Sequence, residues 1–229
     1  MERIGKTDYT GPVSTQRLRF GESSDPVTIA LVRPLEPDRL LDDPGVLDWN
    51  QADDYMPYWA YLWPGAYLLA EAVAAERCLS GTRVLEIGCG LGLSGLVALG
   101  KGASVTFSDY DEAPFLFIEQ SVRSSGFDSS RVETIPLDWR ALPEEPTYPW
   151  ILGADVLYEK RLVPLVANLI ARLLAPGGTA LVADPYRVAA EGFAEAAESL
   201  GLICQRDPIE AETIEHGAVR GTLHRIRWA

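Results

Sequence analysis

The chain has 229 residues, of which 47% are hydrophobic and 23% are charged, a composition that is typical of a globular domain and argues against disorder. Its 33 acidic and 20 basic residues give a net charge of −13, so neither a nucleic-acid backbone nor an anionic membrane is expected as a partner. A negative net charge does not exclude cationic partners.

The first 56 residues are expected to form an N-terminal extension that differs in kind from the rest of the chain. Residues 15–20 and 27–32 are predicted to pair as a β-hairpin around a turn at residues 22–25. The stretch from Glu36 to Asp54 contains seven acids and one base, which gives it −6, close to half of the net charge. A solvated loop is the simplest interpretation of this stretch, and an acidic rim beside a binding site is the alternative.

From about residue 82 the chain alternates short apolar runs with helical patterns. Strands that alternate with helices predict βαβ units, a parallel sheet and right-handed crossovers. The predicted strands are 83–87, 104–108, 131–135, 150–154 and 179–183, closed by 202–206 and 222–228, and the predicted helices are 91–99, 112–125, 160–174 and 189–200.

The most informative stretch is Val-Leu-Glu-Ile-Gly-Cys-Gly-Leu-Gly at residues 84–92, where an apolar strand runs directly into a glycine-rich turn and then a helix. Such a turn lets a ligand approach the main chain, and the N–H groups of the following helix suit an anionic group such as a carboxylate. Gly90, Gly92 and Gly95 match the spacing of a dinucleotide-binding turn, so the spacing alone leaves a dinucleotide open.

Polar and aromatic residues follow the next two strands. Asp109 lies about 20 residues after the glycine turn, where a carboxylate binds ribose hydroxyls in nucleotide folds, although it could instead cap a helix. Asp138 and Trp139 follow the third strand and would suit hydrogen bonding to and stacking on an adenine ring, although Trp139 could instead belong to the core. Residues 175–178 read Ala-Pro-Gly-Gly immediately before the fifth strand.

Taken together, with Glu86 two residues before the first glycine, these features resemble class I S-adenosylmethionine-dependent methyltransferases, whose motif I reads E/D-x-G-x-G-x-G and whose fifth strand follows L-x-P-G-G. The resemblance covers residues 57–229, so we expect a methyltransferase domain there and the extension at 1–56. It implies an α/β, Rossmann-like, doubly wound fold. Its seven-stranded sheet would be mostly parallel with an antiparallel last strand, and the extension adds an N-terminal β-hairpin.

Two further segments are similar to the protein-lysine methyltransferase-like branch, which includes electron-transfer-flavoprotein lysine methyltransferases and relatives of nicotinamide N-methyltransferase. Residues 57–65, with Trp59 and Trp63-Pro64, match its W-x-x-x-W-P segment, and Asp155 to Tyr158 match its D-x-x-Y. Residues 184–187, Asp-Pro-Tyr-Arg, resemble the D-P-G-R of the flavoprotein subgroup, with tyrosine in place of glycine. The [D/N]-P-P-[Y/F] that enzymes methylating adenine or glutamine carry after strand four is replaced here by Ala-Asp-Val-Leu-Tyr.

The resemblance implies S-adenosyl-L-methionine as cofactor and no metal. It assigns catalytic roles to Asp155 and Tyr158, although Asp155 could be a helix cap, and substrate contacts to Tyr58 and Trp59. Trp59 and Trp63, spaced i,i+4, could instead form a core stripe. The implied cofactor-binding residues are Trp63, Glu86, Gly88, Cys89, Gly90, Gly92, Asp109, Tyr110, Asp138, Trp139 and Ala154.

The leading hypothesis is an N-methyltransferase that acts on a protein lysine, because an acidic, aromatic pocket attracts a cationic side chain. The alternatives are a small-molecule methyltransferase of the same fold, a binding protein without catalysis and, last, a nicotinamide dehydrogenase. If the acidic stretch lies at the mouth of the site, neutralising Asp53 and Asp54 should weaken substrate capture, more so at low salt.

The remaining reactive residues are interpreted as structural. Cys78, Cys89 and Cys204 form no CxxC pair, and with only His216 and His224 no zinc site can be assembled from local spacing. We expect Cys89 to be a small apolar filler, His216 to be a solvated loop residue and His224 to be structural. The sparse cysteines suit a reducing cytoplasm, and neither a signal peptide nor a transmembrane helix is expected.

Overall fold

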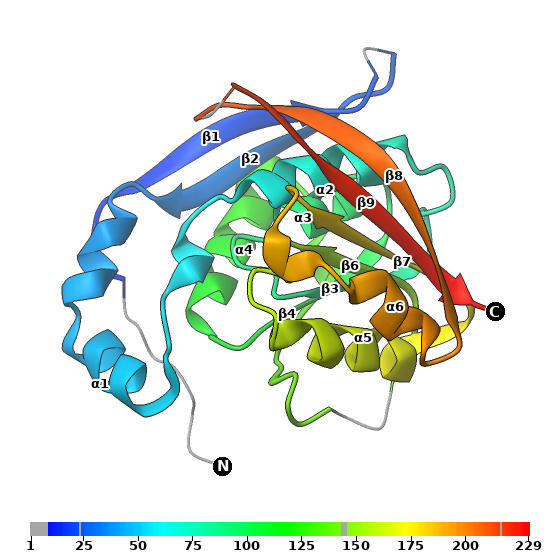
Figure 1. Ribbon diagram of the computed structural model, residues 1–229. Coiled ribbons are helices and arrows are strands. Elements are labelled where there is room, and N and C mark those ends of the chain that lie inside the picture. The colour runs from blue at the N-terminus through cyan, green and yellow to red at the C-terminus, as the bar shows by residue number, and fades with distance from the viewer. Residues whose placement is uncertain (1–8, 23, 143–145, 216) are drawn as a thin grey trace.

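A computed structural model describes residues 9–22, 24–142, 146–215 and 217–229 (Figure 1). In these ranges seven strands form one sheet in the order β5-β4-β3-β6-β7-β9-β8, and only β9 runs antiparallel to the others, which confirms the predicted Rossmann-like topology. The strands are β3 (Arg83–Ile87), β4 (Ser104–Asp109), β5 (Val132–Pro136), β6 (Tyr148–Ala154), β7 (Leu174–Asp184), β8 (Leu202–Thr213) and β9 (Gly217–Trp228).

Helices cover both faces of the sheet (Figure 1). Alternation along β3 explains the two layers: Val84 and Glu86 face α3, while Leu85 and Ile87 belong to the apolar cluster beneath α5 and α6. One face carries α2 (Pro64–Ala75), α3 (Leu93–Gly100) and α4 (Ala113–Ser125), the other carries α5 (Leu162–Leu173) and α6 (Phe193–Glu198), and η3 (Ser129–Arg131) precedes β5.

Most predicted elements lie within two residues of the observed ones, but four differ. The helix predicted over 189–200 is shorter, because Gly192 with φ 87° separates η4 (Val188–Ala190) from α6. Strands β8 and β9 extend beyond the predicted 202–206 and 222–228, since the polar residues 207–213 pair with 217–223 and carry little hydrophobic signal. Strand β7 begins at Leu174 and therefore includes the predicted Pro-Gly-Gly turn, beside a shift in register between Tyr148 and Trp150.

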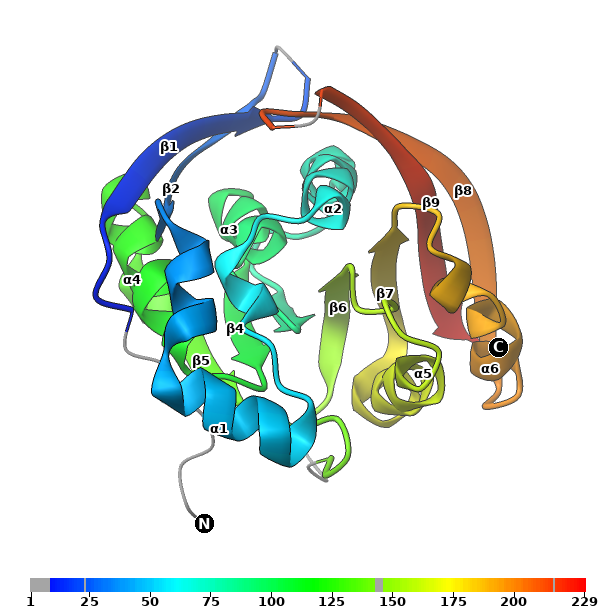
Figure 2. The ribbon, with the colours of Figure 1, turned by 60° about the vertical axis from the view of Figure 1, so that its left-hand side comes forward.

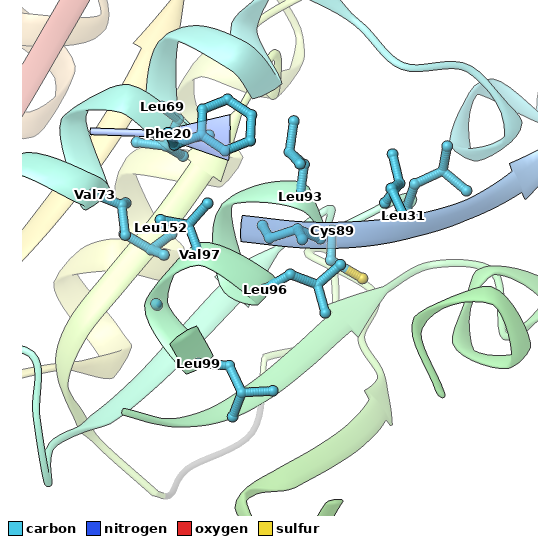
Figure 3. Close-up of a cluster of buried hydrophobic side chains, with 14 of the residues drawn as sticks. Phe20, Leu31, Leu69, Val73, Cys89, Leu93, Leu96, Val97, Leu99 and Leu152 are labelled. Carbon is cyan, nitrogen blue, oxygen red and sulfur yellow. The ribbon is translucent and has the colours of Figure 1, made fainter. Parts of the chain in front are cut away.

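The predicted hairpin is present as β1 (Val13–Phe20) and β2 (Val27–Pro34), with Phe20 paired to Val27; Ser23 of its turn lies outside the described residues. The hairpin packs on α3 and α4 rather than on the sheet, and together with β8 and β9 it arches over α2 and α3 (Figure 2). Figure 3 shows Phe20 and Leu31 of the hairpin among the buried residues of α2 and α3.

The prediction of a loop over Glu36 to Asp54 is wrong, because this stretch forms η1 (Pro37–Asp42) and α1 (Pro44–Asp53), although five of its seven acids are exposed to solvent as expected. Asp43 is the N-cap of α1 and accepts hydrogen bonds from the N–H groups of Gly45 and Val46, while Pro44 occupies the first helical position. A capping aspartate followed by proline is therefore the helix signal that the acidic composition concealed.

Helices throughout the described ranges are too short or too polar to cross a membrane.

Serines of α4 support the hairpin. The N–H of Val32 donates to Ser121 Oγ at 2.8 Å and the N–H of Ala30 donates to Ser125 Oγ at 2.9 Å, so one edge of β2 is bonded to a helix.

We predict that Ser121→Ala lowers the free energy of unfolding by roughly 1 to 3 kcal/mol, because it leaves a buried N–H without its acceptor. Chemical denaturation measures the change. The control Ser124→Ala alters an exposed serine of the same helix, and an equal loss in both variants would contradict the account.

Candidate functional site

A cavity of about 520 Å³ lies at the carboxyl ends of the parallel strands, where doubly wound sheets bind ligands. Its floor comes from the loops after β3, β4 and β6, and residues 53–63 from outside the sheet form one wall. The cavity is lined by every candidate residue selected from the sequence: Tyr58, Trp59, Trp63, Glu86, Gly88, Cys89, Gly90, Gly92, Asp109, Tyr110, Asp138, Trp139, Ala154, Asp155 and Tyr158.

The glycine turn passes between two tryptophans. Gly88, Gly90 and Gly92 have φ of 56°, 48° and 72°, a left-handed conformation that side chains disfavour. A Cβ at Gly88 would lie 2.9 Å from the Trp139 ring, and one at Gly90 would lie 3.4 Å from the Trp59 carbonyl oxygen. Glycine is therefore required by the backbone conformation at all three positions and, at Gly88, also by the close approach of Trp139.

Glu86 caps the helix that follows the turn. Its Oε2 accepts a hydrogen bond of 3.0 Å from the N–H of Gly95 in the first turn of α3. The sequence predicted an anion site at this helix terminus, and an incoming anion would have to compete with Glu86 for these N–H groups. Burial raises the pKa of Glu86 to about 8, although bonds from the N–H groups of Gly95 and Ser94 pull it down.

Asp109 holds the glycine turn from the neighbouring strand. Its Oδ2 accepts from the N–H of Gly90 at 2.8 Å and its Oδ1 accepts from the N–H of Asp111 at 3.1 Å. Burial raises the pKa of Asp109 to about 6, so this group ionises just below neutral pH. The carboxylate thus fixes the turn from the position that suits ribose recognition.

Asp155 joins three segments at the end of β6. Its Oδ2 accepts from the N–H of Gly65 at 2.5 Å, in the first turn of α2, and its Oδ1 accepts from Arg187 Nε at 2.7 Å. Asp155 is therefore a cap, but of a helix distant in sequence, and a Cβ at Gly65 would collide with its carboxylate. Arg187, which the sequence singled out only through the Asp-Pro-Tyr-Arg similarity, completes this group and lies 5.7 Å from the Trp63 ring.

Aromatic side chains surround the mouth of the cavity. Tyr58 and Tyr158 are 40% and 39% exposed, with ring centroids 5.5 Å apart, and Tyr58 is 5.9 Å from Trp63. Trp59 is instead buried against Phe117. The interpretation of Trp59 and Trp63 as one helical stripe is wrong, because Trp59 lies in η2 (Tyr58–Ala60) and Trp63 caps α2. Burial raises the pKa of Tyr158 to about 12, so its phenol stays protonated.

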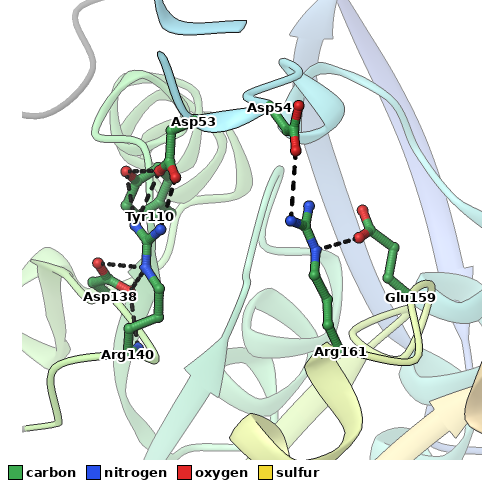
Figure 4. Close-up of polar contacts among 7 residues, drawn as sticks. All are labelled: Asp53, Asp54, Tyr110, Asp138, Arg140, Glu159 and Arg161. Atoms are coloured by element: carbon green, nitrogen blue, oxygen red, sulfur yellow. Dashed lines mark hydrogen bonds and ion pairs between the residues drawn. The ribbon is translucent and has the colours of Figure 1, made fainter. Parts of the chain in front are cut away.

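Two arginines that the sequence did not single out pair with the end of the acidic stretch (Figure 4). Arg140 binds both Asp53 and Asp138, and Arg161 lies 3.6 Å from Asp54. The stretch does reach the cavity, where each arginine is shared with a second acid: Arg140 with Asp138 and Arg161 with Glu159. The attraction of a cationic substrate by Asp53 and Asp54 therefore stays a prediction.

The remaining cysteine and histidine interpretations hold where the structure describes them. Cys89 is buried with a raised pKa, and His224 lies in β9, edge-on to Phe193, where burial lowers its pKa to about 4. His216 lies outside the described residues. Among the residues that are described, no cluster of three histidine, cysteine, aspartate or glutamate side chains could hold a metal.

The chain matches the model of a family described as lysine methyltransferase over residues 59–198. It is 33% identical over 144 residues to the protein N-lysine methyltransferase METTL21A of Xenopus tropicalis, covering 61% of this chain and 65% of the relative. It is 31% identical over 146 residues to the electron transfer flavoprotein beta subunit lysine methyltransferase of Xenopus laevis, covering 61% and 55%. The chain thus spans less than two thirds of either relative.

The fold resembles that of solved methyltransferases. The magnesium protoporphyrin IX methyltransferase from Synechocystis PCC 6803, solved with bound SAH, superposes with a TM-score of 0.56 at 17% identity, covering 71% of this chain and 83% of that one. At this identity the likeness concerns the fold alone.

The buried acid beside the glycine turn predicts a pH-dependent stability. Between pH 4.5 and 8 the unfolded chain is ionised at Glu86 while the folded chain keeps the proton, so this residue makes unfolding easier as pH rises through that window. We predict that Glu86→Gln, which keeps an oxygen for the N–H of Gly95, raises the free energy of unfolding at pH 7.5 by on the order of 1 to 3 kcal/mol. The gain should vanish at pH 4 in urea titrations, and a gain independent of pH would contradict the raised pKa.

Proposed function

We propose that this chain, which belongs to the lysine methyltransferase family, is an S-adenosylmethionine-dependent enzyme that transfers a methyl group to the side-chain nitrogen of a protein lysine. The observation that carries the proposal is the glycine turn, held open by Asp109 and Glu86 at the floor of the cavity. A cavity of about 520 Å³ lies within the ordinary range of cofactor pockets.

The residues present fit the cofactor. The side-chain-free turn at Gly88 and Gly90 permits the cofactor to lie against the main chain, and the carboxylate of Asp109 supplies an acceptor for ribose hydroxyls. Tyr110 and Trp139 offer rings for the adenine. The bound cofactor supplies an electrophilic methyl group on a positively charged sulfur.

The chain's own residues orient the acceptor and exclude water. The acceptor ammonium would lose one proton to solvent first. The neutral nitrogen would then form a bond to the methyl carbon as the carbon–sulfur bond breaks, an in-line displacement that leaves a methylated ammonium. A lysine amine has a reference pKa of about 10.4, so it must lose its proton before it attacks. The rings of Tyr58, Trp63 and Tyr158 attract the cationic side chain at the mouth, and their apolar surface favours the neutral amine once it is enclosed.

The two residues taken from the sequence as catalytic have separate roles in this proposal. Tyr158 remains a phenol, which suits a wall and a hydrogen-bond donor rather than a base. The oxygens of Asp155 accept from Gly65 and Arg187, so Asp155 acts by placing α2 and Trp63 at the mouth. A cytoplasmic location remains our expectation, because Cys78, Cys89 and Cys204 are free thiols.

Calorimetric titration tests the cofactor. We predict that S-adenosylmethionine binds at sub-millimolar concentration and that NAD does not.

Gly90→Arg should weaken cofactor affinity by more than about 100-fold, because the side chain meets the Trp59 backbone and fills the turn. The matched control Gly177→Arg has the same backbone strain, with φ 74°, but open space around it, and should bind normally. Absence of heat with S-adenosylmethionine in the wild-type protein would refute the proposal.

Labelled cofactor identifies the acceptor. The protein is incubated with it and a cell extract, before and after small molecules are removed. We predict that label enters protein in both extracts and is recovered as methylated lysine after hydrolysis, because a flexible amine can reach between the rings at the mouth. Label confined to small molecules, or recovered on arginine or histidine, would contradict the assignment of a lysine acceptor.

A further inference from the structure

One wall of the cavity comes from the end of α1 and the segment that connects it to α2. Residues 53–63, here called the wall segment, connect α1 to α2 and place Tyr55, Met56, Tyr58 and Trp59 against the cavity. The position of this wall therefore depends on how the segment is attached to the core.

Beside the burial of Trp59 and Leu62 in the core, the segment has a polar attachment: a network around one guanidinium group, which we call the latch (Figure 4). Arg140 Nη1 and Nη2 donate to the two oxygens of Asp53 at 2.8 and 3.0 Å, and Arg140 Nε donates to both oxygens of Asp138 at 2.9 and 3.0 Å. Tyr110 donates its hydroxyl to Asp53 at 2.7 Å, and its ring lies 5.2 Å from the guanidinium carbon. Such two-pronged contacts are stronger than single ion pairs, and Arg140 accordingly holds the pKa of Asp53 below its ordinary value.

The next two residues attach elsewhere on the rim. Tyr55 donates its hydroxyl to the buried carboxylate of Asp111 after β4. Asp54 reaches Arg161 before α5 across 3.6 Å, but their side chains are 80% and 61% exposed, so solvent and salt weaken that pair. The latch thus holds the wall on the side of β4 and β5, while the other end of the segment leads into α2, where the N–H of Gly65 donates to Asp155.

The latch is built from the same core residues that fit the cofactor. Tyr110 and Asp138 line the cavity and are also the partners of Arg140. We propose that the latch makes Asp53 and Arg140 positioning residues for the cofactor, whose dissociation requires this ion pair to open. The inference rests on the proposed function and adds to it the route by which the cofactor leaves.

This assignment differs from an attraction of the substrate by the acidic stretch. Because Asp53 is paired with Arg140, replacing it releases the wall rather than removing an unpaired charge from the mouth. The change should therefore appear in KM for the cofactor and in its dissociation rate, while KM for the protein acceptor stays the same.

Stopped-flow displacement of S-adenosylhomocysteine tests the latch in the full chain. We expect Asp53→Asn and Arg140→Gln each to dissociate it about fivefold faster than wild type, which corresponds to about 1 kcal/mol for an ion pair at a surface. The double variant should be no faster than Arg140→Gln alone, since that change already removes the bonds to Asp53. Wild-type dissociation should accelerate with added salt, whereas the variants should respond little. Arg140→Lys keeps the positive charge but loses the two-pronged hydrogen bonds of the guanidinium group, so its dissociation rate should lie between those of wild type and Arg140→Gln.

The matched control is Glu210→Gln, which removes an exposed ion pair with Arg220 on β8 and β9, away from the cavity. It should leave dissociation unchanged. Hydrogen exchange without ligand adds a direct readout: α1 amides should exchange faster in Asp53→Asn than in the control.

The outcomes separate the two proposals. If the wild-type protein fails to bind S-adenosylhomocysteine, the proposed function is refuted. If it binds but Asp53→Asn and Arg140→Gln release it at the wild-type rate, or their effects simply add in the double variant, the latch is refuted and the proposed function stands.

Discussion

The shape of the cavity depends on one buried carboxylate, that of Asp155. A buried carboxylate is costly unless hydrogen-bond donors surround it, so its position is fixed by the groups that it binds. Those groups are the N–H of Gly65 at the start of α2 and the guanidinium of Arg187 after β7. Trp63 lies two residues before Gly65, and the Arg187 guanidinium lies 5.7 Å from its ring, so the contacts that hold Asp155 also place the aromatic mouth. Glu86 near the end of β3 likewise accepts a hydrogen bond from an N–H in the first turn of α3, so two helices beside the cavity are capped by acidic side chains at strand ends.

The N-terminal extension has two roles that its composition alone did not reveal. Its hairpin joins the hydrophobic core through Phe20 and Leu31 and is bonded to α4 by serine hydroxyls. Its end then crosses to the cavity and contributes a wall held by Arg140. Two of the acidic residues have roles within the fold, since Asp43 caps α1 and Asp53 pairs with Arg140, while the other five, Glu36, Asp38, Asp42, Asp48 and Asp54, are exposed.

Local patterns predicted the sheet and the floor of the site, because they act over a few residues. The apolar run of β3 ending in glycines gave that strand its observed bounds, and the glycine turn, Asp109 and Tyr158 line one cavity as expected. The missed ion pairs depend on contacts across the fold. Arg140 is 87 residues from Asp53, and Arg187 is 32 residues from Asp155, so spacing in a single sequence carries no sign of either pair. Helix α1 was missed for a different reason: its capping signal lay inside an acidic run.

The central claim is that this cavity holds S-adenosylmethionine between the glycine turn and the latched wall. A crystal structure of the protein with S-adenosylhomocysteine tests it most directly. We predict ligand in the cavity with ribose hydroxyls on Asp109, adenine beside Tyr110 or Trp139, and Asp53 still bonded to Arg140. Ligand bound elsewhere, or a ribose that makes no contact with Asp109, would contradict the account.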